Sequence, residues 1–267
     1  LWHLLEPVTA EVMALAPRLL LIQKIGVGVN TIDLDAARRR NISVCNMPGA
    51  NSQAVAEMTL LLMLATLRRV NHLDHATRTG KTQRLMVDMQ DESGEICGRT
   101  IGLVGYGAVP RLLAPVLTAM GARVVYTCSE AKADAVGAYL SFNELLAVSD
   151  IMSLHVPLTA TTDKMVNAVA IKRMKAGAIL INTSRGGVVD EEALRRALGE
   201  RRLAAAGLDV FASEPLAPDD PLLSLDNVVV TPHVAYLTAE TMARSIHVAA
   251  ENCRRLGSKE ELLHRVV

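Results

Sequence analysis

The feature that most constrains the fold is an alternation between short apolar runs and helical segments. From residue 100 onward, runs rich in Val, Ile, Leu and Ala are separated by segments with helical spacing. This alternation is typical of a parallel sheet with helices on both faces. Strands are predicted over residues 100–104, 123–127, 150–155, 178–182, 205–210 and 227–230, and the helices include 109–120 and 190–198. Six strands with helical crossovers predict an α/β fold with a doubly wound (Rossmann) sheet.

The first part of the chain predicts a smaller α/β domain over residues 1–70. Strands are expected over 18–24 and 42–45, and Asn51 or Ser52 can cap a long helix that continues to about Val70. A polar, irregular stretch over 77–98 separates this part from the Rossmann domain, which we place at 71–236. A last helix over 238–256 is expected to end at Gly257, and the segment 237–267 is expected to return to the first domain.

Composition excludes several classes of partner. Half of the 267 residues are hydrophobic but only 3% are aromatic, so the core must be aliphatic. The 28 Lys and Arg residues equal the 28 Asp and Glu residues, which leaves no basic field for nucleic acid or an anionic membrane surface. No apolar run approaches the roughly 20 residues that span a bilayer. We therefore expect neither a nucleic-acid partner nor a membrane partner.

The cysteines and the first residue bear on the cellular location of the protein. Cys45, Cys97, Cys128 and Cys253 are scattered and form no CxxC pair. We therefore expect no metal site, no disulfide and a cytoplasmic protein with reduced thiols. The sequence begins with Leu1 rather than Met and nothing like a signal peptide follows, so we expect it to begin partway into a longer natural protein.

A glycine turn between a strand and a helix has the pattern of a dinucleotide loop. Gly105 allows a tight turn, and Gly107 lets the backbone approach a pyrophosphate. The amides at the helix start can then point at the phosphates. Pro110 replaces the third glycine; it is tolerated in a first helical turn, but its ring is expected to push the helix from the strand. A glycine turn of no special function is the alternative. The candidate cofactor-binding residues here are Gly105, Tyr106, Gly107, Ala108 and Val109.

The end of the second Rossmann strand bears on the choice between NAD and NADP. An Asp or Glu about twenty residues after the glycine turn binds the adenosine ribose of NAD. Here Thr127 stands at that position, followed by Cys128 and Ser129, and Glu130 lies too far along. No carboxylate is present to repel a 2′-phosphate, but Lys132 is the only nearby cation in the sequence. The cofactor is therefore NAD or NADP, and the choice stays open.

Three polar residues follow three successive apolar runs. Arg185, Glu214 and His233 supply a cation, a carboxylate and an imidazole at the carboxyl ends of predicted parallel strands, where such sheets bind ligands. A guanidinium fork holds the carboxylate of a 2-oxo acid, and an imidazole can supply the proton that its reduction requires. The glutamate can orient the imidazole. Alone, each residue also fits a structural role; together they favour a catalytic site for hydride transfer.

Once these segments are assembled, nearly the whole chain resembles the D-isomer-specific 2-hydroxyacid dehydrogenase family. The matching stretches, in the family's order, are residues 26–33, 51–57, 102–107, 155–159, 181–190, 207–215 and 231–234. The resemblance implies hydride transfer between NAD(P) and a small D-2-hydroxy or 2-oxo acid, as in phosphoglycerate dehydrogenases and glyoxylate or hydroxypyruvate reductases. It also implies a homodimer, and it makes the first domain a flavodoxin-like substrate-binding domain that is incomplete at its N-terminus.

The resemblance assigns further roles. Val27, Gly28 and Asn51 are expected to bind the substrate together with Arg185, and Asp209 is expected to contact the nicotinamide carboxamide. The remaining expected cofactor contacts are His155, Val156, Pro157, Thr162, Thr183, Ser184, His233 and Ala235. Which 2-oxo acid is reduced is not determined by these residues.

Two other functions fit the same residues. The family includes corepressors that bind the dinucleotide as a ligand, although this sequence shows no charged tail or added module. Formate and phosphite dehydrogenases oxidise other small anions with the same fold. A catalytically degenerate member is the third alternative, because Pro110 and the missing ribose carboxylate depart from the pattern. Turnover with a 2-oxo acid distinguishes a 2-hydroxyacid dehydrogenase from all three.

Overall fold

The computed structural model of the protein describes residues 1–83, 89 and 93–267. It contains two compact units, one formed by Leu1–Ala54 with Tyr236–Val267 and the other by Val55–Ala235. Each unit has its own parallel sheet and its own hydrophobic core.

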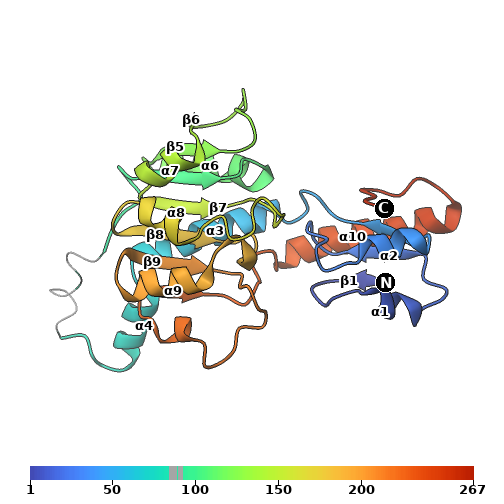
Figure 1. The fold of residues 1–267 in the computed structure, drawn as a ribbon, viewed down its shortest axis with the longest axis horizontal. Coiled ribbons are helices and arrows are strands. Elements are labelled where there is room, and N and C mark those ends of the chain that lie inside the picture. Colours follow the sequence, from blue (N-terminus) through green and yellow to red (C-terminus); the bar gives the residue numbers. More distant parts are fainter. Residues whose placement is uncertain (84–88, 90–92) are drawn as a thin grey trace. The chain divides into compact units, whose positions relative to one another are not determined.

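The larger unit is built on a seven-stranded, entirely parallel sheet (Figure 1). Its strands are β4 (Thr100–Val104), β5 (Arg123–Thr127), β6 (Ala138–Tyr139), β7 (Ile151–Leu154), β8 (Ala178–Asn182), β9 (Leu203–Leu208) and β10 (Val228–Val230). Their spatial order is β10-β9-β8-β7-β4-β5-β6. The chain therefore winds outward in one direction from β4 and in the other from β7. Ligands of such sheets bind at the carboxyl ends of the strands beside this switch point.

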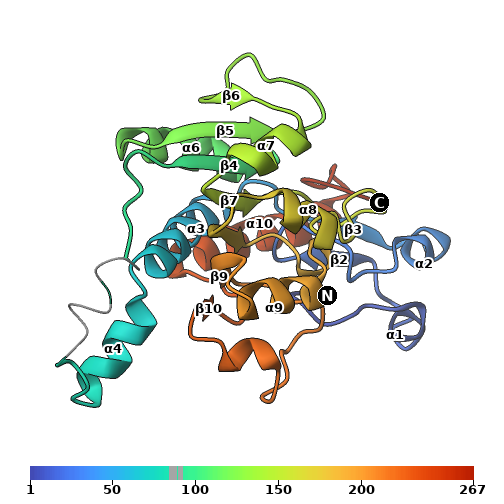
Figure 2. The same ribbon diagram turned by 60° about the vertical axis from the view of Figure 1, so that its left-hand side comes forward.

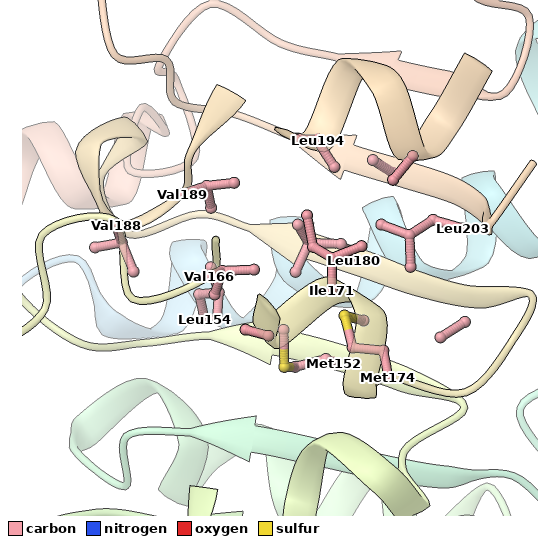
Figure 3. Close-up of a cluster of buried hydrophobic side chains, with 14 of the residues drawn as sticks. Met152, Leu154, Val166, Ile171, Met174, Leu180, Val188, Val189, Leu194 and Leu203 are labelled. Atoms are coloured by element: carbon pink, nitrogen blue, oxygen red, sulfur yellow. The ribbon is translucent and has the colours of Figure 1, made fainter. Parts of the chain in front are cut away.

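Helices cover both faces of this sheet. The residues of α7 (Phe142–Val148), α8 (Ala168–Arg173) and α9 (Glu191–Gly199) pack in one core, part of which is drawn in Figure 3, while α3 (Ser52–Leu67) and α6 (Ala108–Ala119) pack in the other. Burial on both faces explains why the strands read as nearly continuous apolar runs. The unit also contains α4 (Val70–Arg78) and the short helices η1 (Gly186–Val188) and η2 (Pro221–Ser224).

Several helices begin where the sequence supplies a capping side chain. Ser141 and Glu144 form a reciprocal capping box at the start of α7. Asn167 caps α8, and Asp190 caps α9 by accepting a bond from the backbone N–H of Ala193. These bonds satisfy backbone donors that the first helical turn leaves open.

Each predicted strand is present, with ends that differ from the prediction by at most three residues, and two predictions about the intervening segments were wrong. The strand β6 adds a seventh strand, which was not predicted because its two residues are exposed and form no apolar run. The first long helix ends at Leu67 rather than at Val70, because Arg69 adopts a left-handed conformation. A new helix, α4, then extends away from the sheet and occupies the start of the stretch 77–98 that was expected to be irregular (Figure 2). Residues 84–88 and 90–92 of that stretch lie outside the described residues.

The boundary between the compact units lies after Ala54, whereas the predicted boundary between the functional domains lies after residue 70. The reason is the packing of α3, whose residues Leu62, Met63 and Leu67 are buried in the core under the seven-stranded sheet. The predicted domains 1–70, 71–236 and 237–267 thus correspond to compact units with different bounds.

The smaller unit has a three-stranded parallel sheet in the order β1-β2-β3. Its elements are β1 (Trp2–His3), α1 (Ala10–Ala14), β2 (Leu21–Lys24), α2 (Leu34–Arg39), β3 (Ser43–Cys45) and α10 (Ala239–Ser258). Helix α10 reaches β2 through a bond of 2.6 Å between Asn252 Nδ2 and Gln23 Oε1. The prediction that Gly257 ends this helix was wrong: the helix continues to Ser258 and is terminated by Lys259 in a left-handed conformation.

Among the helices of the described residues, none combines the length and apolar character needed to cross a membrane.

Candidate active site

The glycine turn lies where β4 meets α6, beside the switch point of the sheet. Gly105 has φ +94°, and a Cβ there would lie 2.7 Å from the carbonyl oxygen of His155. Only glycine fits this position without strain. Gly107 precedes the first turn of α6, where no side chain caps the helix, and a Cβ there would meet nothing within 4 Å. The amides of Ala108 and Val109 therefore begin a helix whose N-terminus suits a pyrophosphate.

The structure accommodates two unusual residues of this turn. Pro110 is buried as the third residue of α6, where its missing N–H removes no bond of the helix. The side chain of Tyr106 turns into the core, where its hydroxyl accepts from Val136 N at 2.7 Å and donates to Val136 O at 3.1 Å. Only the backbone of Tyr106 is therefore placed to face a dinucleotide.

The end of β5 carries small polar residues instead of a carboxylate. Thr127 is buried, and its carbonyl oxygen accepts from Gly105 N at 2.8 Å. Cys128 Sγ donates to Glu130 O, and Glu130 itself forms an ion pair of 2.7 Å with Lys132. Nearby, Arg111 stacks over the Tyr106 ring at 5.6 Å and pairs with Asp134. Each of these two cations thus has an acidic partner.

The loop after β7 contributes His155, Val156, Pro157 and Thr162. His155 Nε2 lies 2.9 Å from Ser153 Oγ, and burial lowers the pKa of His155 to about 3. The imidazole is therefore neutral near pH 7. Thr162 Oγ1 donates to Pro157 O at 2.6 Å and accepts from Thr159 N at 2.8 Å, which closes the loop on itself.

The turn after β8 presents Arg185. A Cβ at Gly186 would lie only 1.8 Å from the carbonyl carbon of Phe211, so this turn packs directly on the backbone of the segment that carries Glu214. Thr183 Oγ1 lies 2.9 Å from Thr59 Oγ1 of α3. Burial lowers the pKa of the Arg185 guanidinium below its ordinary value. The negative charge of Glu214 raises this pKa, but by less than burial lowers it.

Glu214 and His233 form a close pair. His233 Nδ1 lies 2.6 Å from Glu214 Oε2, and Glu214 Oε1 accepts from Phe211 N at 2.9 Å. Burial raises the pKa of Glu214, but the bonds from His233 and Phe211 and the charges of His233 and Arg185 outweigh it. The pKa of this carboxyl therefore lies below its ordinary value.

The loop that carries His233 is fastened to Asp209. This buried carboxylate accepts from Thr231 Oγ1 at 2.5 Å, from Val234 N at 2.9 Å and from Ala235 N at 2.9 Å. His233 N donates to the carbonyl oxygen of Asp209 at 2.7 Å. These bonds hold His233 at φ +55°. A residue other than glycine adopts this left-handed conformation only when its surroundings fix it.

Arg185, Glu214 and His233 thus lie together at the carboxyl ends of β8, β9 and β10, as the sequence predicted for parallel strands. The expected substrate residues Val27, Gly28 and Asn51 belong to the smaller unit. There, Val27 O accepts from Asn46 Nδ2 at 2.9 Å.

Two buried polar residues of this region were not singled out from the sequence. Asn182 bonds to both Ser184 and Arg185, and Thr59 bonds to Thr183. The signal for Asn182 was a polar side chain at the end of an apolar strand, immediately before a functional turn. Thr59 gives no such signal, because it lies in an apolar helix.

The doubly wound sheet and its glycine turn define a Rossmann domain of the kind that binds dinucleotides. Comparison with known proteins supports this class. Residues 60–235, more than half of the chain, match the family profile described as "D-isomer specific 2-hydroxyacid dehydrogenase, NAD binding domain". The chain therefore belongs to the D-isomer-specific 2-hydroxyacid dehydrogenase family, whose members are oxidoreductases.

Individual relatives agree. The chain is 42% identical over 253 residues to a glyoxylate reductase of Korarchaeum cryptofilum, covering 93% of this chain and 76% of the relative. It is 39% identical to a D-3-phosphoglycerate dehydrogenase of Archaeoglobus fulgidus, covering 92% of this chain and 46% of that protein. The crystal structure of the TT0316 protein from Thermus thermophilus superposes with a TM-score of 0.91 at 40% identity, covering 98% of this chain and 83% of that one.

Proposed function

We propose that this protein transfers a hydride between NAD(P) and a small D-2-hydroxy acid or its 2-oxo acid. The observation that carries the proposal is the grouping of Arg185, Glu214 and His233 at the carboxyl ends of three neighbouring strands, with His233 Nδ1 at 2.6 Å from Glu214 Oε2. The glyoxylate reductase and phosphoglycerate dehydrogenase relatives favour 2-oxo acids of two or three carbons as substrates.

Arg185 is proposed to bind the substrate carboxylate. Its guanidinium can form two parallel bonds to a carboxylate, a geometry that lysine does not reproduce. Its partial burial strengthens its interaction with an anion, because less water screens the charge. By the family resemblance, the backbone amides around Val27 and Gly28 and the side chain of Asn51 are also proposed to bind the substrate.

His233 is proposed to exchange the proton with the substrate oxygen. Because Nδ1 faces Glu214, Nε2 is the nitrogen through which the proton passes. In reduction the imidazolium donates to the carbonyl oxygen as negative charge develops there; in oxidation the neutral imidazole takes the hydroxyl proton. Glu214 stabilises the imidazolium and fixes the orientation of the ring.

The residues of the larger unit fit the nicotinamide cofactor. The open space at Gly107 and the uncapped start of α6 suit the pyrophosphate, and residues 127–129 are proposed to meet the adenosine ribose. Asp209, His155, Val156, Pro157, Thr162, Thr183, Ser184 and Ala235 complete the proposed cofactor contacts. When bound, the nicotinamide supplies or accepts the hydride. Either NAD or NADP is compatible with the end of β5.

Absorbance of the reduced nicotinamide tests the proposal directly. Purified protein is mixed with glyoxylate, hydroxypyruvate, phosphohydroxypyruvate or pyruvate, each with NADH and with NADPH. Oxidation with any acid supports the reaction class and identifies the cofactor. Silence across the panel, with the cofactor still bound, would support the corepressor-like or degenerate alternative instead.

A pair of matched histidine variants tests the proton transfer. His233→Asn should lower turnover by about 10²- to 10⁴-fold, the range for losing a general acid, and should change the Kd for the cofactor far less. Asparagine tolerates the left-handed backbone of this position. His264→Asn is the control, because His264 has the same left-handed conformation, with φ +51°, and is exposed. Near-normal turnover of His233→Asn would contradict the assignment.

A homodimer and a cytoplasmic location are also part of this proposal. Light scattering coupled to size-exclusion chromatography measures the molar mass in solution, and a monomeric mass would exclude the dimer.

A further inference from the structure

The turn that carries Arg185 is held by one buried amide side chain, that of Asn182. Asn182 is the last residue of β8 and is 1% exposed. Its Nδ2 donates to Arg185 O at 2.9 Å, while its Oδ1 accepts from Ser184 N at 3.0 Å and from Ser184 Oγ at 2.9 Å. A single side chain therefore engages both residues that follow Thr183.

The same residue joins this turn to the part of the site that holds His233. The carbonyl oxygen of Asn182 accepts from Asp209 N at 2.9 Å, and Asp209 in turn fastens the loop around His233. The backbone of Phe211 leaves no room for a Cβ at Gly186, so the turn cannot move closer to Phe211 without a steric clash. The position of the Arg185 guanidinium beside Glu214 thus depends on the backbone conformation of the turn at residues 184–186.

We propose that Asn182 is a positioning residue for Arg185: its amide fixes the backbone of residues 184 and 185 so that the guanidinium is presented to the substrate carboxylate. This inference rests on the proposed function, because it takes the role of Arg185 from there. A carboxamide suits the task, since it supplies one donor and one acceptor without adding charge beside the guanidinium.

The chain offers a closely matched control in Asn227. This residue is also buried, at 6% exposed, and its Nδ2 donates to two backbone carbonyls, Leu198 O at 3.2 Å and Ala204 O at 3.1 Å. Its own carbonyl oxygen accepts from Ala206 N of the neighbouring strand at 3.0 Å. It precedes β10, at the opposite end of the strands from Arg185. Replacing either asparagine removes buried hydrogen bonds from the side-chain amide to the backbone, but only Asn182 lies in the proposed site.

The test compares Asn182→Leu and Asn182→Ala with Asn227→Leu and Asn227→Ala. Leucine keeps the branched shape and removes both hydrogen-bonding groups; alanine is the substitute where leucine prevents folding. The Asn182 variants should raise KM for the 2-oxo acid by about tenfold, the consequence of losing a buried hydrogen bond at the carboxylate site. The Asn227 variants should leave KM for the 2-oxo acid unchanged. Their loss of thermal stability should be comparable to that of the Asn182 variants.

Hydrogen exchange of residues 183–188 is measured on the same proteins. Exchange of these amides should accelerate in the Asn182 variants and not in the Asn227 variants. Equal KM and equal exchange in the two sets overturn the inference while leaving the proposed function intact. If the wild-type protein reduces no acid, the proposed function fails, and unchanged exchange in the Asn182 variants then overturns the inference independently. If Arg185→Ala turns over normally, Arg185 has no substrate role and the inference falls with it.

Discussion

Both carboxylate oxygens of Glu214 are engaged, one by Phe211 N and the other by His233 Nδ1. The Glu214→Gln variant keeps the size of the side chain and removes its charge, so the imidazolium loses its stabilising partner. We expect turnover to fall by about 10- to 100-fold, a moderate loss for a group that acts through the general acid. Glu192→Gln on the exposed face of α9 is the control. Equal rates for both variants would contradict the role of Glu214.

The protonation of Glu214 sets a limit on the acid side of the activity profile. Its pKa lies below the ordinary value of 4.5, because the bonds and charges of its neighbours outweigh the effect of burial. The carboxylate form therefore persists as pH falls to 4.5 and is lost only below it. Loss of wild-type activity through this group should accordingly begin below pH 4.5, as measured by kcat/KM against pH in a range where the fold is intact.

Gly186 shows how a single missing Cβ sets the geometry of a site. In the Gly186→Ala variant the new carbon would lie 1.8 Å from the carbonyl carbon of Phe211, so the backbone must move. We expect a destabilisation of about 1–3 kcal/mol, typical of overpacking, and a raised KM. Gly199→Ala is the control, since nothing lies within 4 Å of a Cβ there. Urea denaturation and steady-state kinetics measure both effects; equal stability of the two variants would refute this steric argument.

Single residues of the candidate site could be predicted where their position follows from the neighbouring sequence. Arg185, Glu214 and His233 could be singled out because each follows an apolar strand, and parallel strands bring their carboxyl ends to one edge. The supporting residues could not be assigned in this way. Asn182 and Thr59 act through bonds to other segments, and the bonds from Asp209 to residues 231–235 exist only after β9 and β10 have paired.

At the level of elements, two glycines with open surroundings, Gly257 in α10 and Gly177 just before β8, test how backbone conformation decides the effect of a Gly→Ala change. Gly257 lies within α10, and a Cβ there would meet nothing within 4 Å. Gly257→Ala should therefore stabilise the protein by about 0.5 kcal/mol, because alanine has the higher helix propensity. Gly177 is equally open but has φ +75°. Gly177→Ala should destabilise by about 1 kcal/mol, the cost of a left-handed alanine. Unfolding free energies of the two variants with the same sign would contradict this reasoning.

The observed ends of helices and strands match the predicted ends where an apolar run or a capping residue sets them. The strands β4, β5 and β8 have the predicted bounds, since each apolar run ends at a turn. Helix α9 begins after its cap, Asp190, where the sequence predicted a helix start. The end of α3 and the continuation of α10 through Gly257 were mispredicted, because residues there have weak local preferences that the surrounding structure overrides.

At the scale of the whole molecule, His155 couples stability to pH. Burial lowers its pKa from an ordinary 6.5 to about 3, so between these values the unfolded chain binds a proton that the folded protein does not. Stability from this group is therefore fully present above pH 6.5 and declines as pH falls toward 3. The free energy of unfolding in urea should fall more steeply from about pH 7 to about pH 4.5 for the wild type than for His155→Asn. Parallel pH profiles for the two proteins would show that His155 carries no such linkage.

The α/β class, the glycine turn and the three polar residues at strand ends could be predicted from the sequence alone. These depend on local patterns, namely apolar runs, turn residues and the regular geometry of parallel strands. Tertiary contacts establish which residues hold those groups in place and where one compact unit ends and the next begins. The division after Ala54 follows from the burial of α3 under the seven-stranded sheet, and the setting of Arg185 and His233 follows from bonds between segments far apart in the chain. Such contacts form only when the strands pair and the core packs, so no local pattern specifies them.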